Sequence, residues 1–317
     1  MKSKSIIIYY TQTGNTKKIA DAIYAGISKR TGQCDIRHLK DIDAAKGLVD
    51  YDLIGLGAPV WGDGVPHVLK LVEGMVGVDG KHAFAFCTHG TLPRPFLGSV
   101  VPAMIQRGLT MIGWNDWYGS CCVPMMPKPY FTDGHPDEID LKEAEDFGSE
   151  IAELSRRIYG GETDLIPSFP RGKDYDEIYG ESLGPNAGLP EDSATAVSFP
   201  LVVNMDKCTR CNLCVDNCPT NSIDFSVSPP LFKFDCAKCW LCEQICPQGA
   251  IEYDWAPATK VCNDVMRDLF VAEIAKAEAK GRFRRLVPLD SIGWDTPWYK
   301  VKQPPRFRKN KDGYFEP

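Results

Sequence analysis

The first 160 residues alternate between continuous apolar runs and apolar positions spaced three and four residues apart. Residues 5–10 form a run typical of a buried strand, and residues 15–30 place Ile19, Ile23 and Ile27 on one face of a helix. The same patterns predict strands at 53–56, 82–87 and 109–114, and helices at 67–75, 96–107 and 141–159. Strands that alternate with helices predict an α/β fold, a doubly wound parallel sheet with helices on both faces.

This alternation ends at Gly160 and Gly161. Residues 162–199 are rich in Pro, Gly, Asp and Ser and show no sustained period, so they are predicted to link a domain at 1–161 to a smaller one at 200–256. In the remaining region, 257–317, we expect a helix at 264–280 and an irregular, basic tail at 282–317.

Eight of the 13 cysteines form two runs with the spacing C-x-x-C-x-x-C-x-x-x-C-P. This is the spacing of bacterial ferredoxins, in which three cysteines of a run ligate one [4Fe–4S] cluster and the fourth ligates the other cluster. The sequence therefore predicts two clusters, one held by Cys208, Cys211, Cys214 and Cys246 and the other by Cys236, Cys239, Cys242 and Cys218.

Disulfides and zinc are the alternatives for these cysteines. Disulfides need an oxidising compartment, whereas residues 1–10 lack the apolar core of a signal peptide, which favours a cytoplasmic protein. Zinc prefers paired C-x-x-C knuckles with longer gaps between them. Both alternatives are weaker than two cubane clusters.

The duplication extends beyond the cysteines. A shift of 28 residues superposes Pro219 on Pro247 and Ile223 on Ile251. Each half is thus predicted to be a cysteine loop followed by a short strand, and the two halves to pack on each other as a small α+β domain.

Charge is unevenly distributed along the chain. The net charge is −6, and residues 262–317 carry 12 Lys and Arg against 8 Asp and Glu, which leaves −10 on the first 261 residues. An acidic body suits basic redox partners and argues against nucleic acid. No apolar run approaches the roughly 18 residues of a membrane span.

The loop after the first strand, residues 11–16 (TQTGNT), leads directly into a helix. Backbone N–H groups at a helix N-terminus, together with hydroxyl side chains, suit a phosphate. The loop lacks the Gly-Lys-Ser/Thr ending of a triphosphate loop and contains no basic residue before Lys17. It therefore predicts a monophosphate site, with a plain Thr- or Asn-capped helix as the alternative.

A second candidate loop, residues 57–64 (GAPVWGDG), follows the strand at 53–56. Gly55 and Gly57 do not begin a dinucleotide fingerprint, because Val60 stands where the third glycine belongs. Trp61, flanked by small residues at a sheet edge where ligands bind, could instead support a flat ring. A loop tryptophan used only for packing is the alternative.

These loops, with residues 87–100 (CTHGTLPRPFLGSV), resemble the three FMN loops of flavodoxins, and residues 4–256 as a whole resemble the flavodoxin–ferredoxin fusions of the EFR1 type. Residues 123–130 (VPMMPKPY) resemble a further segment of that family. The resemblance implies a flavodoxin-like domain whose FMN contacts are Thr11, Gln12, Thr13, Gly14, Asn15, Thr16, Pro59, Val60, Trp61, Gly62, Thr88, His89 and Gly90.

The third loop departs from the family pattern, which has an aromatic residue followed by two glycines. Here His89 stands between Thr88 and Gly90. Its imidazole could stack on the flavin or donate to its pyrimidine edge, and a cationic ring would favour a reduced, anionic flavin. His89 is therefore the candidate catalytic residue, with a solvent-facing loop histidine as the alternative.

Five cysteines lie outside the two runs. Cys34 and Cys87 fall in strand-like apolar runs typical of a core, and Cys262 is expected to have no chemical role. The adjacent pair Cys121 and Cys122 could be redox-active, although packing is the simpler interpretation.

The resemblance and the motifs together predict an electron-transfer protein of an anaerobe. We expect a low-potential redox protein to donate electrons, which pass through the clusters and FMN to an acceptor enzyme. The flavin–cluster contact could form within one chain or across a homodimer. One alternative is an FMN-dependent reductase with a substrate at Thr88, His89, Trp61 and the tail residues Trp294, Trp298 and Tyr299. Another is a subunit that its basic tail binds into a larger complex; that tail could equally be a strap over its own domains.

Overall fold

The computed structural model describes residues 4–60, 66–179, 201–233, 236–311, 313 and 315–316. The chain divides into two compact units. The first contains Met1–Gly119 and Gly134–Glu181, and the second contains Ser120–Asp133 and Ser182–Pro317. The chain therefore passes between the units more than once, because the short segment 120–133 interrupts the first unit.

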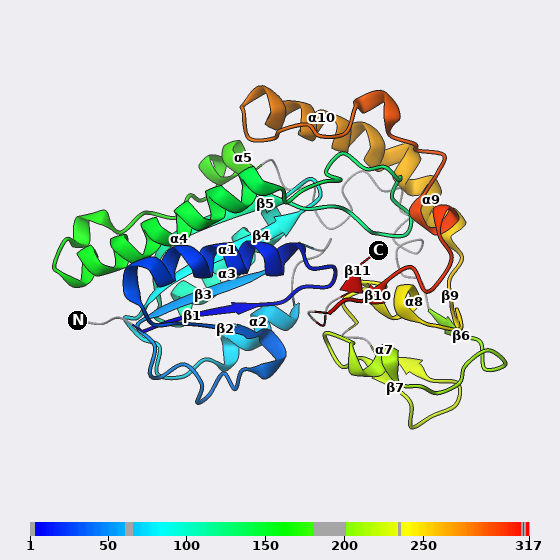
Figure 1. The fold of residues 1–317 in the computed structure, drawn as a ribbon, viewed down its shortest axis with the longest axis horizontal. Helices are drawn as coiled ribbons and strands as arrows, with labels where there is room; N and C mark the ends of the chain where they lie inside the picture. The colour runs from blue at the N-terminus through cyan, green and yellow to red at the C-terminus, as the bar shows by residue number, and fades with distance from the viewer. Residues whose placement is uncertain are drawn as a thin grey trace. The chain divides into compact units, whose positions relative to one another are not determined.

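The first unit is built on a five-stranded parallel sheet of order β2-β1-β3-β4-β5 (Figure 1). Adjacent strands pair in register, for example Ser5 with Leu53 and Leu53 with His82. This is the predicted doubly wound sheet, with an edge strand added at 34–38. The strands are β1 Ser5–Tyr9, β2 Cys34–His38, β3 Leu53–Pro59, β4 His82–His89 and β5 Thr110–Tyr118.

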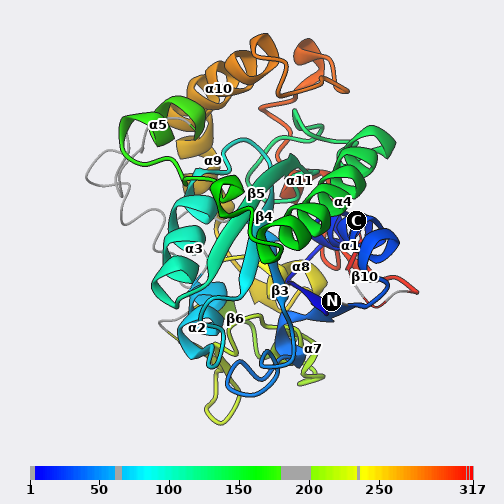
Figure 2. The same cartoon turned by 90° about the vertical axis from the view of Figure 1, so that its left-hand side faces the viewer.

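Helices cover both faces of this sheet (Figure 2). One apolar cluster joins α1 and α4 to one face, and another joins α2 and α3 to the opposite face. Along each central strand the side chains alternate between the clusters, as they do for Ile7 and Ile8 on β1. The four helices are α1 Asn15–Thr31, α2 Pro66–Gly74, α3 Arg94–Gln106 and α4 Glu138–Tyr159.

Two glycine sites explain how closely these elements approach. A Cβ on Gly26 of α1 would clash with the backbone oxygen of Glu145 on α4, so the two helices can be this close only with glycine there. On β3, Gly55 and Gly57 leave room for the rings of Phe84 and Phe86 on β4. The Gly-x-Gly of β3 therefore serves packing, in agreement with the absence of a dinucleotide fingerprint.

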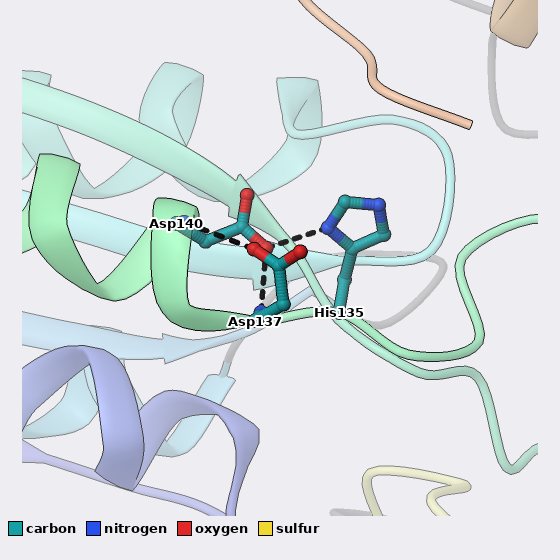
Figure 3. A group of neighbouring side chains, drawn as sticks. All are labelled: His135, Asp137 and Asp140. Carbon is teal, nitrogen blue, oxygen red and sulfur yellow. Dashed lines mark hydrogen bonds and ion pairs between the residues drawn. The ribbon is translucent and has the colours of Figure 1, made fainter. Parts of the chain in front are cut away.

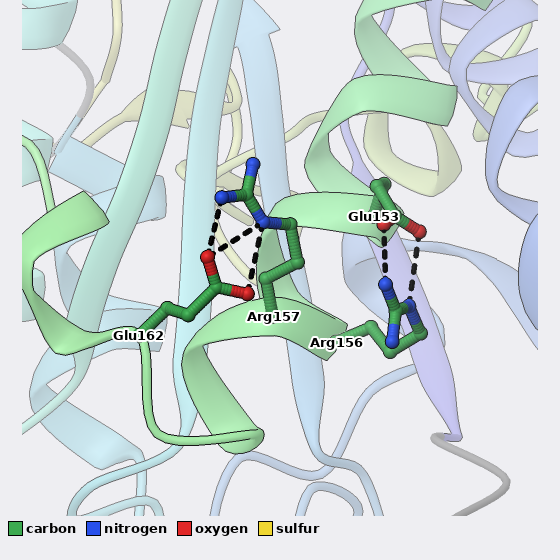
Figure 4. A network of polar contacts seen from close by, with 4 residues as sticks. All are labelled: Glu153, Arg156, Arg157 and Glu162. Atoms are coloured by element: carbon green, nitrogen blue, oxygen red, sulfur yellow. Dashed lines mark hydrogen bonds and ion pairs between the residues drawn. The ribbon is translucent and has the colours of Figure 1, made fainter.

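The end of α4 carries two surface ion pairs (Figure 4). Arg156 Nη2 lies 2.5 Å from Glu153 Oε1, and Arg157 pairs with Glu162 just beyond the helix. Exposed pairs of this kind contribute little to stability because solvent screens them.

The first unit continues past the expected boundary at residue 161. Residues Thr163–Leu165 form a 3₁₀ turn, and Lys173–Tyr179 form α5. Tyr175 and Tyr179 of α5 are buried in the apolar cluster that contains α2 and α3. Two aromatic side chains thus anchor a segment whose Pro- and Gly-rich sequence predicts a linker. The rest of that predicted linker, 180–199, lies outside the described residues.

Short elements make up the cysteine-rich part of the second unit. Strands β6 Val202–Val203 and β9 Ile251–Glu252 pair antiparallel, as do β7 Ile223–Asp224 and β8 Leu231–Phe232. The cysteine loops carry the helices α7 Leu213–Asp216 and α8 Leu241–Ile245. The prediction that each loop is followed by a short strand is confirmed at Ile223 and Ile251.

The C-terminal helix begins earlier than residue 264. Asp254 caps it by accepting a hydrogen bond from Ala256 N at 3.0 Å. The helix then runs through α9 Trp255–Val261, a π-helical turn Cys262–Met266 and α10 Arg267–Ala279. The 3₁₀ turn Leu289–Ser291, α11 Trp298–Val301 and the paired strands β10 Arg308–Lys309 and β11 Phe315–Glu316 follow. No described helix is both long and apolar enough to cross a membrane.

Backbone hydrogen bonds tie this tail to the segment 120–133, within the second unit. Lys128 N donates to Thr296 O at 3.1 Å, and Trp298 N donates to Met126 O at 2.8 Å. These bonds explain why a loop between β5 and α4 groups with the second unit. The tail is therefore packed on its own unit, whereas the strap alternative has it crossing both domains.

Candidate cofactor sites

The sheet brings the three predicted FMN loops to one edge. In the strand pairing Tyr9 lies beside Gly57, Pro59 beside Thr88, and His89 beside Tyr118. The carboxyl ends of β1, β3 and β4 therefore share the edge at which ligands bind in open parallel sheets.

The first loop leaves the start of α1 without a side-chain cap. Gly14 is the N-cap residue with φ 87°, a left-handed conformation that glycine adopts without strain. Thr11 Oγ1 accepts a hydrogen bond from Gly14 N at 3.1 Å, which closes the loop before the helix begins. The N-cap position is thus occupied by a glycine and not by the Thr or Asn of the capped-helix alternative, and a helix N-terminus of this kind is suited to donate to an anion.

The loops are joined by hydrogen bonds. The buried hydroxyl oxygens of Thr16 and Thr88 lie 2.8 Å apart, and Val60 N donates to Thr88 O at 2.9 Å. The Thr16 hydroxyl thus links the first loop to the third, and its backbone N–H is a further group that could reach a phosphate. Thr13, Asn15, Pro59 and Val60 are partly exposed, whereas Trp61 and Gly62 lie outside the described residues.

His89 is the last residue of β4 and is only 4% exposed, so it is not a solvent-facing loop histidine. Its Nε2 lies 2.9 Å from Asp116 Oδ2, and its ring lies 4.5 Å from that of Tyr118, centroid to centroid. Its Nδ1 is buried and has no hydrogen-bond partner among the described residues. A buried polar atom without a partner at this edge fits a ligand that supplies one.

Sequence reasoning missed Asp116. Our predicted strand ended at residue 114, whereas β5 continues to Tyr118. An acidic residue between the aromatic residues of Trp114–Tyr118 was the available signal.

The first predicted cluster set lines one apolar cavity. Cys208, Cys211, Cys214 and Cys246 all contribute to its wall, together with side chains such as Ile223 and Phe225. A cage with four thiols and aliphatic and aromatic walls fits a [4Fe–4S] cube, which needs thiolate ligands and limited access of water.

The second set is also brought together. Burial is the main cause that raises the pKa of Cys239 to about 12, and the nearby sulfurs of Cys236 and Cys218 add to the rise. Burial likewise raises the pKa of Cys242, with smaller contributions from Cys239, Cys236, Cys214 and Cys218. Four neighbouring thiols with restricted access to water are unfavourable as free anions but suit a cationic iron cluster, which deprotonates its thiol ligands.

The two cysteine loops share an unusual backbone conformation. Among the described residues, every non-glycine residue with a positive φ lies in these loops or just after them. Each such residue has a partner 28 positions away: Arg210 and Lys238 (φ 53° and 49°), Asn212 and Trp240 (61° and 53°), Asn221 and Gly249 (53° and 56°).

Hydrogen bonds to sulfur repeat in the same way. Ser222 N donates to Cys218 Sγ and Ala250 N donates to Cys246 Sγ, both at 3.3 Å. Ser222 and Ala250 are again 28 residues apart. The duplication therefore extends from the sequence to the backbone dihedrals and to the N–H···S bonds that tune a cluster.

Comparisons with known proteins agree with this geometry. The flavodoxin family pattern matches residues 7–76, and the pattern of the 4Fe-4S binding domain matches residues 201–224. The chain is 36% identical over 102 residues to a probable flavodoxin 2 of Bacillus subtilis, which covers 31% of this chain and 68% of that protein. The chain belongs to the flavodoxin family.

Solved flavodoxins align with the flavodoxin part. A flavodoxin from the domain Archaea is 22% identical with a TM-score of 0.39, and flavodoxin 2 from Bacillus cereus is 24% identical with a TM-score of 0.38. Each alignment covers 48% of this chain and 99% of the other. The assignment of the fold rests on the strand order itself. A flavodoxin domain implies FMN, and the second matched pattern implies a [4Fe–4S] cluster.

The cysteines outside the two runs of this flavodoxin fusion are neutral thiols. Burial raises the pKa of Cys34, Cys121 and Cys262 to about 12, and it also raises the pKa of Cys87 and Cys122. Neutral thiols are poor nucleophiles and poor partners for disulfide exchange. These pKa directions favour packing over redox chemistry for the five side chains.

A group of three potential metal ligands in the flavodoxin unit has a structural explanation (Figure 3). The ligand atoms of His135, Asp137 and Asp140 all lie within 4.8 Å of one another. However, Asp140 Oδ2 accepts hydrogen bonds from Asp137 N at 2.8 Å and bonds His135 Nδ1 at 2.6 Å, while Asp137 Oδ1 accepts from Ile139 N at 3.0 Å. The group is a capping box that begins α4, with a histidine added.

Proposed function

We propose that this protein is a flavodoxin–ferredoxin fusion of the EFR1 type that carries low-potential electrons between two [4Fe–4S] clusters and FMN and delivers them to a partner redox enzyme. The observation that carries this proposal is the repeat of the cysteine loops, in sequence and in backbone, in the same chain as the FMN edge. When bound, FMN accepts one or two electrons, whereas each cube exchanges one.

The protein's part is to hold and tune these groups. Cys208, Cys211, Cys214 and Cys246 would hold the first cluster, and Cys236, Cys239, Cys242 and Cys218 the second. The paired N–H···S bonds to Cys218 and Cys246 support a second cluster equivalent to the first. At the sheet edge, the uncapped turn of α1 would hold the FMN phosphate, and the loops after β3 and β4 would hold the ring.

His89 would act on the flavin from the end of β4. Asp116 fixes its Nε2 at 2.9 Å, so the ring has a defined orientation and its buried Nδ1 is left to face a ligand. His89→Ala is expected to shift the midpoint potential of the flavin, and Asp116→Asn is expected to produce a smaller shift in the same direction, because it loosens the ring without removing it. A redox titration with unchanged flavin potential in His89→Ala would eliminate this role.

The partners are proposed from charge and chemistry. With a net charge of −10 on the first 261 residues, a basic surface on the donor or acceptor would favour encounter. No nicotinamide fingerprint is present in the sequence, so a reduced ferredoxin or a similar one-electron protein is the donor that suits the clusters.

Turnover experiments distinguish this carrier from a reductase. Reduced ferredoxin should load the protein with electrons that leave only when a partner redox enzyme is supplied. Reduction of a small substrate with reduced ferredoxin alone would favour an FMN-dependent reductase instead.

A further inference from the structure

The two cysteine loops have the same backbone but are covered differently. In the first loop, helix α7 has no buried residue, and Cys211 is exposed. In the second loop, the equivalent helix α8 buries four of its five residues: Leu241, Glu243, Gln244 and Ile245. The two cysteine loops are therefore alike in sequence and backbone but differ in how far other parts of the chain cover them.

The cover over the second loop comes from the C-terminal tail. Trp298, Phe307 and Phe315 form one apolar cluster with Leu241 and Ile245 of α8. We call Trp298, Arg306, Phe307 and Phe315 the C-terminal strap. Figure 1 shows β10 and β11, which follow Phe307 and contain Phe315, beside α8.

Polar contacts fix the strap to α8 specifically. Arg306 Nη1 donates to both carboxylate oxygens of Glu243, at 2.5 Å to Oε1, and both side chains are nearly fully buried. Arg306 N donates to Gln244 O at 2.7 Å, and Trp298 Nε1 donates to Gln244 Oε1 at 3.1 Å.

The first loop cannot make these contacts. By the 28-residue shift, Val215 and Asp216 stand where the second loop has Glu243 and Gln244. The Val215 side chain cannot pair with a buried guanidinium, and the Asp216 side chain is shorter than that of Gln244. A buried ion pair is weak evidence for stability, but it does specify which surfaces meet, since either charge is costly to bury alone.

We propose that the C-terminal strap is a positioning element that shields the second cysteine loop and leaves the first accessible, so that the two [4Fe–4S] sites differ in their exposure to solvent. Glu243 and Gln244 select the second loop for the strap, and Arg306 and Trp298 are the residues that recognise them. The inference rests on the proposed function in one respect, that both sites hold clusters.

Site-resolved iron loss tests this proposal. The anaerobic holoprotein is treated with a ferrous chelator and a thiol-alkylating reagent, and peptide mass spectrometry follows the alkylation of each cysteine with time. In the natural chain, Cys208 and Cys211 are expected to be alkylated at least about tenfold faster than Cys236 and Cys239, because the strap must first open. Equal rates at the two loops would overturn the proposal.

Substitutions in the C-terminal strap test whether its contacts with α8 are what slows alkylation of the second loop. Arg306→Gln leaves the Glu243 carboxylate buried without its partner and should accelerate alkylation of Cys236 and Cys239 at least about tenfold, with Cys208 and Cys211 unchanged. Arg306→Lys keeps the charge and should restore part of the protection. The matched control Arg308→Gln changes an exposed arginine of the same segment and should leave every rate unchanged.

The outcomes separate the inference from the function it rests on. A natural chain with about four irons instead of eight would contradict the second cluster, and thus the proposed function. Eight irons with rates insensitive to Arg306→Gln would overturn the strap. If Arg306→Gln does not yield a folded holoprotein, Trp298→Phe removes a single hydrogen bond and should accelerate the second loop about threefold to fivefold; no acceleration would again overturn the strap.

Discussion

The two units of this protein are held together in different ways. Strands of five to nine residues in the flavodoxin unit place large apolar clusters on both faces of one sheet. The cysteine-rich unit has strands of two residues and a small apolar cluster around α8. Two-residue strands and a small local cluster offset less of the chain entropy of an ordered domain than one continuous sheet core does. The sheet unit therefore supports its cofactor site with its own core, whereas we expect the cysteine loops of the second unit to depend on bound iron and on the strap for their order.

Removal of iron should produce the largest difference in stability between the two units. Chelation of both clusters is expected to abolish the cooperative structure of the second unit while the flavodoxin unit remains folded, because metal binding supplies folding free energy where the core is small. Hydrogen exchange measured by mass spectrometry would locate the change. Protection lost in residues 201–252 and kept in β1, β3 and β4 is the expected result; retained protection in both units would contradict it.

A substitution at the α1–α4 contact should instead destabilise the flavodoxin unit and leave the second unit unchanged. Gly26→Ala places a Cβ against the backbone oxygen of Glu145, so the helices must separate, at a cost of about 2 kcal/mol or more in the stability of the flavodoxin unit. Denaturant unfolding of the two units, followed separately, would measure it. Iron content should not change, and Glu73→Ala on the exposed end of α2 should leave stability within about 0.5 kcal/mol.

Acidic pH should lower the stability of the flavodoxin unit more than that of the second unit, because all five histidines lie in the flavodoxin unit. Burial, with smaller effects of His38 and Lys40, lowers the pKa of His67 to about 4. The unfolded chain binds a proton near pH 6.5 that the folded chain excludes until about pH 4, so stability falls as the pH falls through this window.

For His67 alone the loss is about 2 kcal/mol between pH 7 and pH 5. Burial lowers the pKa of His82 and His38 as well, which acts in the same direction. His67→Gln should flatten the pH dependence of unfolding of the flavodoxin unit. A profile as steep as that of the natural chain would show that His67 is not the group responsible.

The sequence predicted those parts of the molecule in which the local pattern and the tertiary environment agree. The central strands are buried on both faces and read as continuous apolar runs, and Gly14 marks the turn into α1. The half-exposed edge strand β2 has only a weak pattern, and the sequence indicated no more than a strand-like run at Cys34.

Other features depend on contacts far apart in the sequence. Tyr175 and Tyr179 make α5 part of the core, although the surrounding residues read as a linker. Asp116 becomes informative only when the strand register brings it to His89. The role of Arg306 required its pairing with Glu243, 63 residues away, and no local pattern reports such a pair.

The central claim is that one chain holds FMN and two [4Fe–4S] clusters that exchange electrons. An anaerobic reductive titration of the purified protein, with visible and electron paramagnetic resonance spectra and with iron and FMN quantification, tests it most directly. The account predicts about eight irons and one FMN per chain and an uptake of about four electrons, two by the flavin and one by each cluster. Fewer than about six irons, or an uptake of about two electrons with no cluster signal, would contradict it.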